Sequence, residues 1–463
     1  MNKGRVMAGR HLNLKSTEDV RQFVAEQDPK HIKVGFFDID GVFRGKYIAK
    51  AKFLSALENG YGFCDAVLGW DVADTLYDNS SFTGWHTGYP DANLRILPES
   101  GMILPFDNET VFFSSEFAGR AKDICPRAVL RRVLKRAEDM GFMAKTAMEF
   151  EFFMFQESPD SLEEKGFRNL TPLTPGNFSY SALRSIVHED LYQDILDTFS
   201  SIDIELEGLH AETGPGVLET AIAVDDALAM ADKASIFKAF MKILAQKRGL
   251  MATFMAKWNQ ELSGQSGHTH MSLWSLDEKP VFFDPADQHK MSPTMRHFLG
   301  GQLAYLRDFA AMIAPNVNSY ARLTPGYWAP TSATWGVDNR TVGIRVIPGS
   351  EKSHRLEYRI PGSDVNPYLS MAAAIGSGLL GIEKGIEPGE PAVGNAYDLD
   401  VPMDRQLPTN LESAGILFGA SDAAKDLFGE AFVEHFAASR VFEAHEYGRA
   451  VTDWELRRYF EVL

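Results

Sequence analysis

The stretch Met148–Phe155 carries two glutamates in an alternating pattern that could support metal chemistry. Successive side chains of a strand point to opposite faces, so Glu149 and Glu151 share one face while apolar residues occupy the other. With a rise of about 3.3 Å per residue, the two carboxylates lie roughly 7 Å apart, which suits two neighbouring metal ions better than one. A half-buried strand with a solvated polar face would show the same pattern, so this segment alone leaves both interpretations open.

Three further segments repeat this alternation with Glu, His and Arg side chains. A solvated sheet face rarely collects so many of them, and numerous buried carboxylates repel one another unless cations lie among them. The combined pattern therefore favours a binding site over a solvated face. The residues are His268 and His270, the trio Arg355, Glu357 and Arg359, the pair Glu205 and Glu207, and Glu212 and Glu219 on either side of the turn at 214–216.

The residue types in this set indicate the ligand. Carboxylates dominate, with one or two imidazoles and no thiolate, and such hard ligands favour Mg²⁺ or Mn²⁺ over zinc or copper. Arginines interleaved with metal-binding carboxylates suit phosphoryl transfer, because guanidinium groups stabilise the spreading negative charge. The sequence contains no G-x-x-x-x-G-K-[ST] motif. We therefore predict an ATP site that is built without a P-loop.

Composition excludes several other classes of protein. The chain has 463 residues and a net charge of −17, which argues against nucleic acid as a partner. Cys64 and Cys125 are its only cysteines, so neither a disulfide framework nor a thiolate zinc site is available. It has no run of about 18 apolar residues, and Met1–Lys15 is basic without an apolar stretch. We expect no membrane partner and a cytoplasmic location.

The strands and helices that the sequence predicts around these side chains indicate an α+β protein of two domains. A small N-terminal domain is expected over residues 1–115 and a large domain over residues 116–463, since a more regular pattern begins near Pro126. Apolar runs, helical spacing and turn residues give the individual elements. These are strands over 31–37 and 42–49, helices over 52–58, 126–141, 225–249, 295–313 and 369–384, a loop over 79–100, and an irregular excursion over 156–180.

Several separate motifs, in the same order along the chain, resemble the signatures of the glutamine synthetase family. The segment Asp40–Lys46 and the Asn-Val-Asn-Ser-Tyr run look more like its γ-glutamylpolyamine and γ-glutamylamide synthetase branch. The motifs are Asp40–Lys46, Glu149-Phe-Glu151, His210-x-Glu212 with Glu219, Ser266–Met271, Pro315–Gly326, Asp338-Asn-Arg340, Arg355–Arg359 and Asn366-Pro-Tyr368.

This resemblance implies a fold, an assembly and a reaction. The fold is an N-terminal β-grasp-like domain on a catalytic domain with a curved antiparallel sheet flanked by helices. The assembly is a homo-oligomer, a hexameric ring commonly stacked as a dodecamer, with each active site between adjacent subunits and the segment Trp454–Leu463 in an inter-ring contact. In the reaction, ATP phosphorylates the side-chain carboxylate of L-glutamate, and a small amine displaces phosphate, an activity that we expect in amine catabolism.

The resemblance also implies a role for each matching residue. Glu151, Glu212 and Glu219 match the ligands of one metal ion, and Glu149, His268 and Glu357 those of a second. Arg340 matches the arginine that stabilises the transferred phosphoryl group, while Arg322, Arg359 and Gly264 match the glutamate site. Arg345, Arg355, Glu207 and His270 match nucleotide contacts. For Arg355 and Glu207, a salt bridge on the sheet is an alternative.

Two departures from the family pattern bear on the nitrogen donor. Ammonia-using members carry a glutamate after the Pro-Gly-Tyr run, where this chain has Trp328. Its large apolar face suits packing on an alkyl or aryl amine rather than binding ammonium, although a lid residue that only packs the loop is an alternative. The ammonia-users' Asp-Gly-Ser-Ser element is also missing, and Asp65 is the candidate for a shifted base.

Two other functions stay open at this point. An ordinary glutamine synthetase that uses ammonia is the alternative within the class. A catalytically silent structural or regulatory member is the alternative outside it, but such proteins tend to lose metal ligands, whereas all six matching positions here are Glu or His. Tyr397 weakly resembles a tyrosine that is adenylylated in some family members, and an ordinary packed loop residue is the simpler interpretation.

Overall fold

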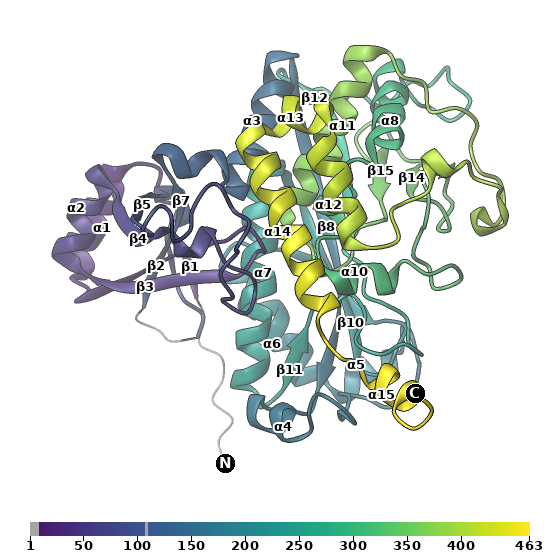
Figure 1. Ribbon diagram of the computed structural model, residues 1–463. Coiled ribbons are helices and arrows are strands. Elements are labelled where there is room, and N and C mark those ends of the chain that lie inside the picture. Colours follow the sequence, from purple (N-terminus) through teal and green to yellow (C-terminus); the bar gives the residue numbers. More distant parts are fainter. Residues whose placement is uncertain (1–8, 107–109) are drawn as a thin grey trace.

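The computed structural model describes residues 9–106 and 110–463, so residues 1–8 of the basic start and 107–109 fall outside the description. Within the described ranges the strands form two sheets (Figure 1). The smaller sheet comes from the first part of the chain and lies on one side of a larger helix-covered body. The α+β class is confirmed; the last strand of the small sheet ends at Phe117 and the next helix begins at Pro126, and a boundary at residue 115 stays our proposal.

The N-terminal sheet has the strand order β1-β6-β7-β2-β3, and β5 joins β4 to β7. β2 and β3 pair antiparallel through the turn that follows Phe37, and β2 pairs parallel with β7. Two helices, α1 (Thr17–Gln27) and α2 (Lys50–Asn59), accompany it. The strands are β1 (Arg10–His11), β2 (His31–Phe37), β3 (Phe43–Ala49), β4 (Tyr61–Cys64), β5 (Asp91–Ile96), β6 (Met102–Ile103) and β7 (Val111–Phe117).

The second sheet has the order β13-β14-β15-β12-β8-β10-β9, with β11 paired to β8. Its pairs are antiparallel, as the resemblance implies, except that β13 and β14 run parallel. The strands are β8 (Phe142–Phe155), β9 (Leu206–Ala211), β10 (Val217–Asp226), β11 (Met251–Thr253), β12 (Thr269–Ser275), β13 (Trp335–Val337), β14 (Ile344–Ile347) and β15 (Arg355–Tyr358).

Helices cover one face of this sheet and leave the other for the site. The long helices α7 and α11 pack with α3 and α8 over the apolar side of β8 in a single buried core. The helices are α3 (Pro126–Asp139), α4 (Pro159–Glu164), α5 (Ala182–Val187), α6 (Glu189–Ser200), α7 (Ala227–Lys247), α8 (Pro293–Tyr305), α9 (Ala310–Ile313), α10 (Val317–Arg322), α11 (Pro367–Lys384), α12 (Leu411–Ala420), α13 (Asp422–Phe428), α14 (Glu430–Gly448) and α15 (Asp453–Tyr459).

The alternation in β8 is the feature that positions the chemistry. Met148, Phe150 and Phe152 are fully buried, and the rings of Phe150 and Phe237 stack at a centroid distance of 6.0 Å. Burying such a side chain contributes on the order of 2 kcal/mol relative to exposure. A one-residue slip in register would therefore expose this row and bury the carboxylates. The predicted apolar and acidic faces of the strand are confirmed.

Two predicted boundaries are wrong. The predicted loop over 79–100 contains β5, whose inward residues Leu94 and Ile96 are buried between polar neighbours. The Gly, Pro and Asn residues of positions 79–90 obscured this short alternating segment. The helical pattern over 295–313 is divided into α8 and α9 by a turn. Apolar residues continue through the turn because it is buried, with Leu306 and Phe309 in the core.

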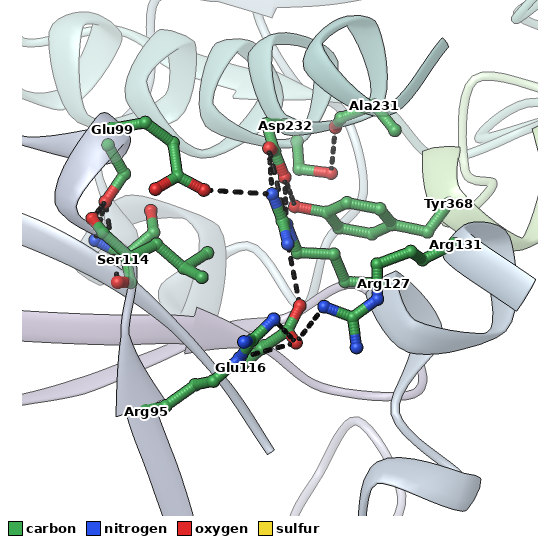
Figure 2. A network of polar contacts seen from close by, with 12 residues as sticks. Arg95, Glu99, Ser114, Glu116, Arg127, Arg131, Ala231, Asp232 and Tyr368 are labelled. Atoms are coloured by element: carbon green, nitrogen blue, oxygen red, sulfur yellow. Dashed lines mark hydrogen bonds and ion pairs between the residues drawn. The ribbon is translucent and has the colours of Figure 1, made fainter. Parts of the chain in front are cut away.

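A buried ionic network fixes the N-terminal sheet to the catalytic body (Figure 2). Glu116 of β7 is 1% exposed and accepts hydrogen bonds from Arg127 of α3 at 2.7 Å and from Arg95 of β5 at 2.9 Å. Arg127 also donates to Asp232 of α7, which accepts the Tyr368 hydroxyl of α11 at 2.7 Å. Although burial alone would raise it, the pKa of Glu116 is lowered by these arginines. The network joins the N-terminal sheet to α3, to α7 and to the N-terminus of α11.

Candidate active site

The polar face of the second sheet lines a cavity of about 500 Å³. Five glutamates, two histidines and three arginines meet there, together with aromatic residues from neighbouring loops. Every residue that the motifs assign to metal binding is among them. The lining comprises Glu149, Glu151, Ser179, Tyr180, His210, Glu212, Thr213, Glu219, Ser263, Gly264, Ser266, His268, Tyr327, Trp328, Arg340, Arg345, Glu357 and Arg359.

One acidic cluster is built by the register of β8, β10 and β9. Glu219 in β10 lies directly opposite Glu151 in β8 and opposite His210 in β9. Glu212 follows β9 immediately, and its ligand atoms lie within 4.8 Å of those of His210 and Glu219. The three glutamates predicted to hold one metal ion are therefore neighbours, and His210 joins them.

A second cluster is built by β8, β12 and β15. His270 in β12 is the cross-strand partner of Glu357, and its Nε2 lies 2.9 Å from Oε1 of Glu149. Nδ1 of His268 lies 3.3 Å from carboxylate oxygens of both Glu149 and Glu357. The ligand atoms of Glu149, His270 and Glu357 lie within 4.8 Å of one another. His270, which the motifs assign to the nucleotide, thus belongs equally to this cluster.

The donor set fits divalent cations. Burial, and then the charges of Glu151 and Glu149, raise the pKa of Glu219 to about 9, so the cluster cannot hold all its carboxylates ionised without added positive charge. Buried ligand atoms also lack partners among the described residues: Oε2 of Glu212 and Nε2 of His268 accept or donate no hydrogen bond. Carboxylate oxygens and neutral imidazoles are ligands that suit Mg²⁺ or Mn²⁺.

The arginines of the cavity differ in whether their guanidinium groups already have hydrogen-bond or ion-pair partners. Arg345 donates to Glu357 at 2.9 Å and to Asp338 at 3.1 Å, and Arg359 also contacts Glu357. Arg340 is exposed at the cavity, and within the described ranges no hydrogen bond or ion pair engages its guanidinium group. Arg340 is therefore the arginine most available to an anionic group that enters the cavity.

Of two residues that were predicted to form the glutamate site, Gly264 lies at the wall of the acidic cavity and Arg322 lies behind it. Arg322 is 2% exposed, donates to the carbonyl of Ile360 at 2.7 Å and to Oγ of Ser266 at 2.9 Å, and does not line the cavity. Gly264 lines it, and a Cβ there would lie 2.6 Å from Cγ of Arg322. In this arrangement Arg322 supports the wall, and its direct contact with substrate stays a prediction.

The predicted base, Asp65, is not part of its own chain's cavity. It begins a short 3₁₀ helix, η1 (Asp65–Leu68), in the N-terminal domain and is 7% exposed. Burial raises the pKa of its carboxyl group. It does not line the acidic cavity, and its role as a base stays a prediction.

A second cavity of about 460 Å³ is lined by three of the residues predicted to contact nucleotide, whereas the fourth, Arg345, lines the acidic cavity. Glu207, His270 and Arg355 all line the second cavity, and Nε of Arg355 donates to Nδ1 of His270 at 3.2 Å. Glu149 lines both cavities and so joins them. Lys145, whose Nζ lies 5.0 Å from the Trp274 ring, also lines it. Sequence reasoning missed Lys145, although it shares the face of Glu149 at even spacing along the strand.

The two cavities share Glu149; one is acidic with free and paired arginines, and the other has a basic and aromatic wall. These are residue types that suit metal-assisted phosphoryl transfer. Residues 123–459 match the family described as glutamine synthetase, catalytic domain. The chain is 38% identical over 457 residues to the glutamate–isopropylamine ligase of a Pseudomonas species, spanning 97% of this chain and 99% of that one. It is 42% identical to the type-1 glutamine synthetase 2 of Dictyostelium discoideum, spanning 93% and 84%.

Two further comparisons agree. The gamma-glutamylethanolamide synthetase of Streptomyces coelicolor is 37% identical, over 96% of both chains. A solved structure of GmaS without ligand superposes with a TM-score of 0.82 at 28% identity, covering 95% of this chain and 98% of that one. The chain belongs to the glutamine synthetase family and is a carbon–nitrogen ligase. Members of this family use ATP and divalent metal ions. Among the described residues, no helix is long and apolar enough to cross a membrane.

Proposed function

We propose that this chain is an ATP-dependent ligase that joins a primary amine to the γ-carboxylate of L-glutamate and produces a γ-glutamylamide. The observation that carries this proposal is Trp328 at the acidic cavity, where its side chain is 57% exposed. An apolar ring offers an alkyl or aryl amine a contact surface that ammonia cannot use. The relatives named as glutamate–isopropylamine ligase and gamma-glutamylethanolamide synthetase support an organic amine as acceptor. We place the activity in the cytoplasm and in amine catabolism.

The two cavities divide the reaction between them. ATP occupies the cavity of Glu207 and Arg355, with its γ-phosphate directed past Glu149 into the acidic cavity, where Arg359 holds glutamate. Divalent cations, when bound by the two glutamate–histidine clusters, neutralise phosphate oxygens. An oxygen of the γ-carboxylate then attacks the γ-phosphorus and ADP leaves, while Arg340 stabilises the charge on the transferred group.

The second step forms the amide bond. The amine nitrogen attacks the γ-carbonyl carbon of γ-glutamyl phosphate, and phosphate leaves with the oxygen that it received. The nitrogen loses a second proton as the amide forms, and the departing phosphate takes up that proton. The amine arrives as an ammonium ion, which the carboxylates of Glu212 and Glu219 attract into the cavity, and it must lose a proton before it attacks. We assign that proton to the carboxylate of Asp65 of a neighbouring subunit, because Asp65 lines neither of the two catalytic cavities of its own chain.

The proposal is tested by ADP release from ATP with L-glutamate and Mg²⁺ across a panel of acceptors. The panel contains ammonia, methylamine, isopropylamine, ethanolamine, putrescine and aniline, each with a control that lacks glutamate. We expect strong turnover with at least one organic amine and little with ammonia. Efficient turnover with ammonia alone would make the chain an ordinary glutamine synthetase. The name of the Dictyostelium relative, type-1 glutamine synthetase 2, supports that alternative. No glutamate-dependent turnover with any acceptor would favour the silent structural or regulatory member.

Trp328→Glu is expected to shift the acceptor preference toward ammonia. A carboxylate at this position attracts ammonium and removes the apolar surface, so kcat/KM for ammonia should rise at least tenfold while that for isopropylamine falls. Trp328→Gln is the matched control, because it removes the ring without adding the charge. Steady-state kinetics with both acceptors measure the change. If neither variant alters the ratio of the two kcat/KM values, Trp328 is only a packing residue of its loop.

We propose that the chain forms a homo-oligomer of stacked rings, in which Asp65 of one subunit completes the site of the next. The C-terminal segment supports this: Trp454 is 60% exposed, Phe460 85% and Leu463 96%. A large apolar surface of this kind marks a protein–protein contact. Figure 1 places this segment at the lower edge of the molecule.

Removal of residues 454–463 is therefore expected to convert the assembly into one of about half the mass, measured by analytical ultracentrifugation. The active site should survive, because none of its lining residues lies in this segment. Ile416→Asp, at an exposed apolar position of α12, is the control and should leave the mass unchanged. If the truncated assembly sediments like the intact one, the segment is not part of the contact between subunits.

A further inference from the structure

A third cavity lies beside the catalytic one and shares two of its walls. It has a volume of about 530 Å³, and Trp328 and Arg340 line both. The Trp328 backbone adopts a left-handed conformation, with φ of +61°, which is unusual for a bulky residue. The remaining walls come from His289, the segment 337–341 and the loop 391–394. The groove therefore borders the acidic cavity at Trp328 and Arg340.

The groove differs from the acidic cavity in its chemistry. Its apolar members include Val337, Pro391 and Val393, and the Val393 side chain is 87% exposed. Among the described residues that line the groove, Asp338 carries the only carboxylate that could receive a second ammonium group. That carboxylate is already paired with Arg345, whose Nε donates to it at 3.1 Å.

Arg340 adds a further positive charge to the groove. A cationic end group in the groove would leave water for a surface that is apolar and, through Arg340, repulsive. An uncharged alkyl or aryl group would gain from the same walls, because each buried methylene favours binding by about fourfold. The volume is within the usual range for sites of small organic ligands, so a methyl or isopropyl group would leave most of it unfilled.

We propose that this groove receives the substituent of the acceptor amine, so that the enzyme selects primary monoamines with an extended uncharged alkyl or aryl group over diamines. This inference rests on the proposed ligase function. The nitrogen must lie in the acidic cavity, where the γ-carboxylate is activated, and the substituent then leaves along the face of Trp328 into the groove. Val393 is accordingly a specificity-determining residue.

The test compares pentylamine with cadaverine, which has a similar chain but carries a second ammonium group at its far end. The readout is the ratio of their kcat/KM values, which is independent of the fraction of active enzyme. In the unmodified protein we expect pentylamine to exceed cadaverine by at least tenfold, and kcat/KM to rise from methylamine to pentylamine. Val393→Asp should lower the ratio about tenfold, and Val393→Lys should raise it. Ile416→Asp, outside the groove, should leave it unchanged.

The outcomes separate this inference from the function on which it rests. If glutamate-dependent ADP release occurs with amines, but cadaverine equals or exceeds pentylamine, the selection against diamines is wrong and the ligase function stands. If the two Val393 variants leave the ratio unchanged, the substituent lies elsewhere. If no amine supports glutamate-dependent ADP release, the proposed function and this inference both fail.

Discussion

Replacing Glu357 by alanine is expected to reduce ADP formation by at least about a thousandfold. The Glu357 side chain is 1% exposed and lies between His268, Arg345 and Arg359. Burial raises the pKa of Glu357, but His268 and Arg359 outweigh that effect and lower it, so the carboxylate is ionised and available to bind a metal ion. The substitution removes that ligand and leaves two arginines without their common partner, which misplaces both.

Metal binding, measured separately from turnover, identifies the cause of this loss of activity. Calorimetric titration should show weaker Mn²⁺ binding in Glu357→Ala than in the unmodified protein, while sedimentation shows an intact assembly. Glu164→Ala, at an exposed position of α4, is the matched control and should behave like the unmodified protein. Normal turnover in Glu357→Ala would overturn the metal assignment of the whole second cluster.

Arg340→Ala is the second substitution with a large expected effect, a fall in kcat of roughly 10²–10³-fold with little change in the KM for ATP. The reason is that Arg340 is exposed at the cavity and unpaired within the described ranges, so its guanidinium group is free to meet charge that develops during transfer. Arg345, in contrast, is engaged by Glu357 and Asp338.

The matched variants separate charge from geometry at this position. Arg340→Lys should recover only part of the rate, because an ammonium group lacks the planar donors that spread over several phosphate oxygens. Arg405→Ala, at an exposed position that lines neither catalytic cavity, should have no effect. A large rise in the KM for ATP with an unchanged kcat would show that Arg340 binds nucleotide in the ground state instead.

Strand periodicity made much of the site predictable. Alternation alone placed Glu149 and Glu151 on one face, because a strand has a period of two and the other face had to be buried. The same rule located His268 and His270, as well as Glu357. Which strands lie next to each other depends on contacts between distant segments, so the pairing of Glu219 with Glu151 became visible only in the fold.

The remainder of the site depends on loops and on contacts that periodicity does not encode. The approach of Arg322 to Gly264 follows from the position of the last residue of α10, whose guanidinium group donates to Ile360 and Ser266. The groove beside Trp328 is formed by loops at 337–341 and 391–394 that are distant in sequence. His210 was part of a recognised motif, yet its place among the ligands required the register of β9 against β10.

The most direct measurement follows oxygen-18 from labelled L-glutamate. With both γ-carboxylate oxygens labelled and isopropylamine as acceptor, the proposed reaction transfers one labelled oxygen to the released phosphate and retains the other in the amide. Mass spectrometry of both products should therefore find one label in each, and Trp328→Glu with ammonia should give the same partition. Unlabelled phosphate would contradict activation of the γ-carboxylate by phosphorylation, and the central claim of a glutamate–amine ligase that acts through γ-glutamyl phosphate would be wrong.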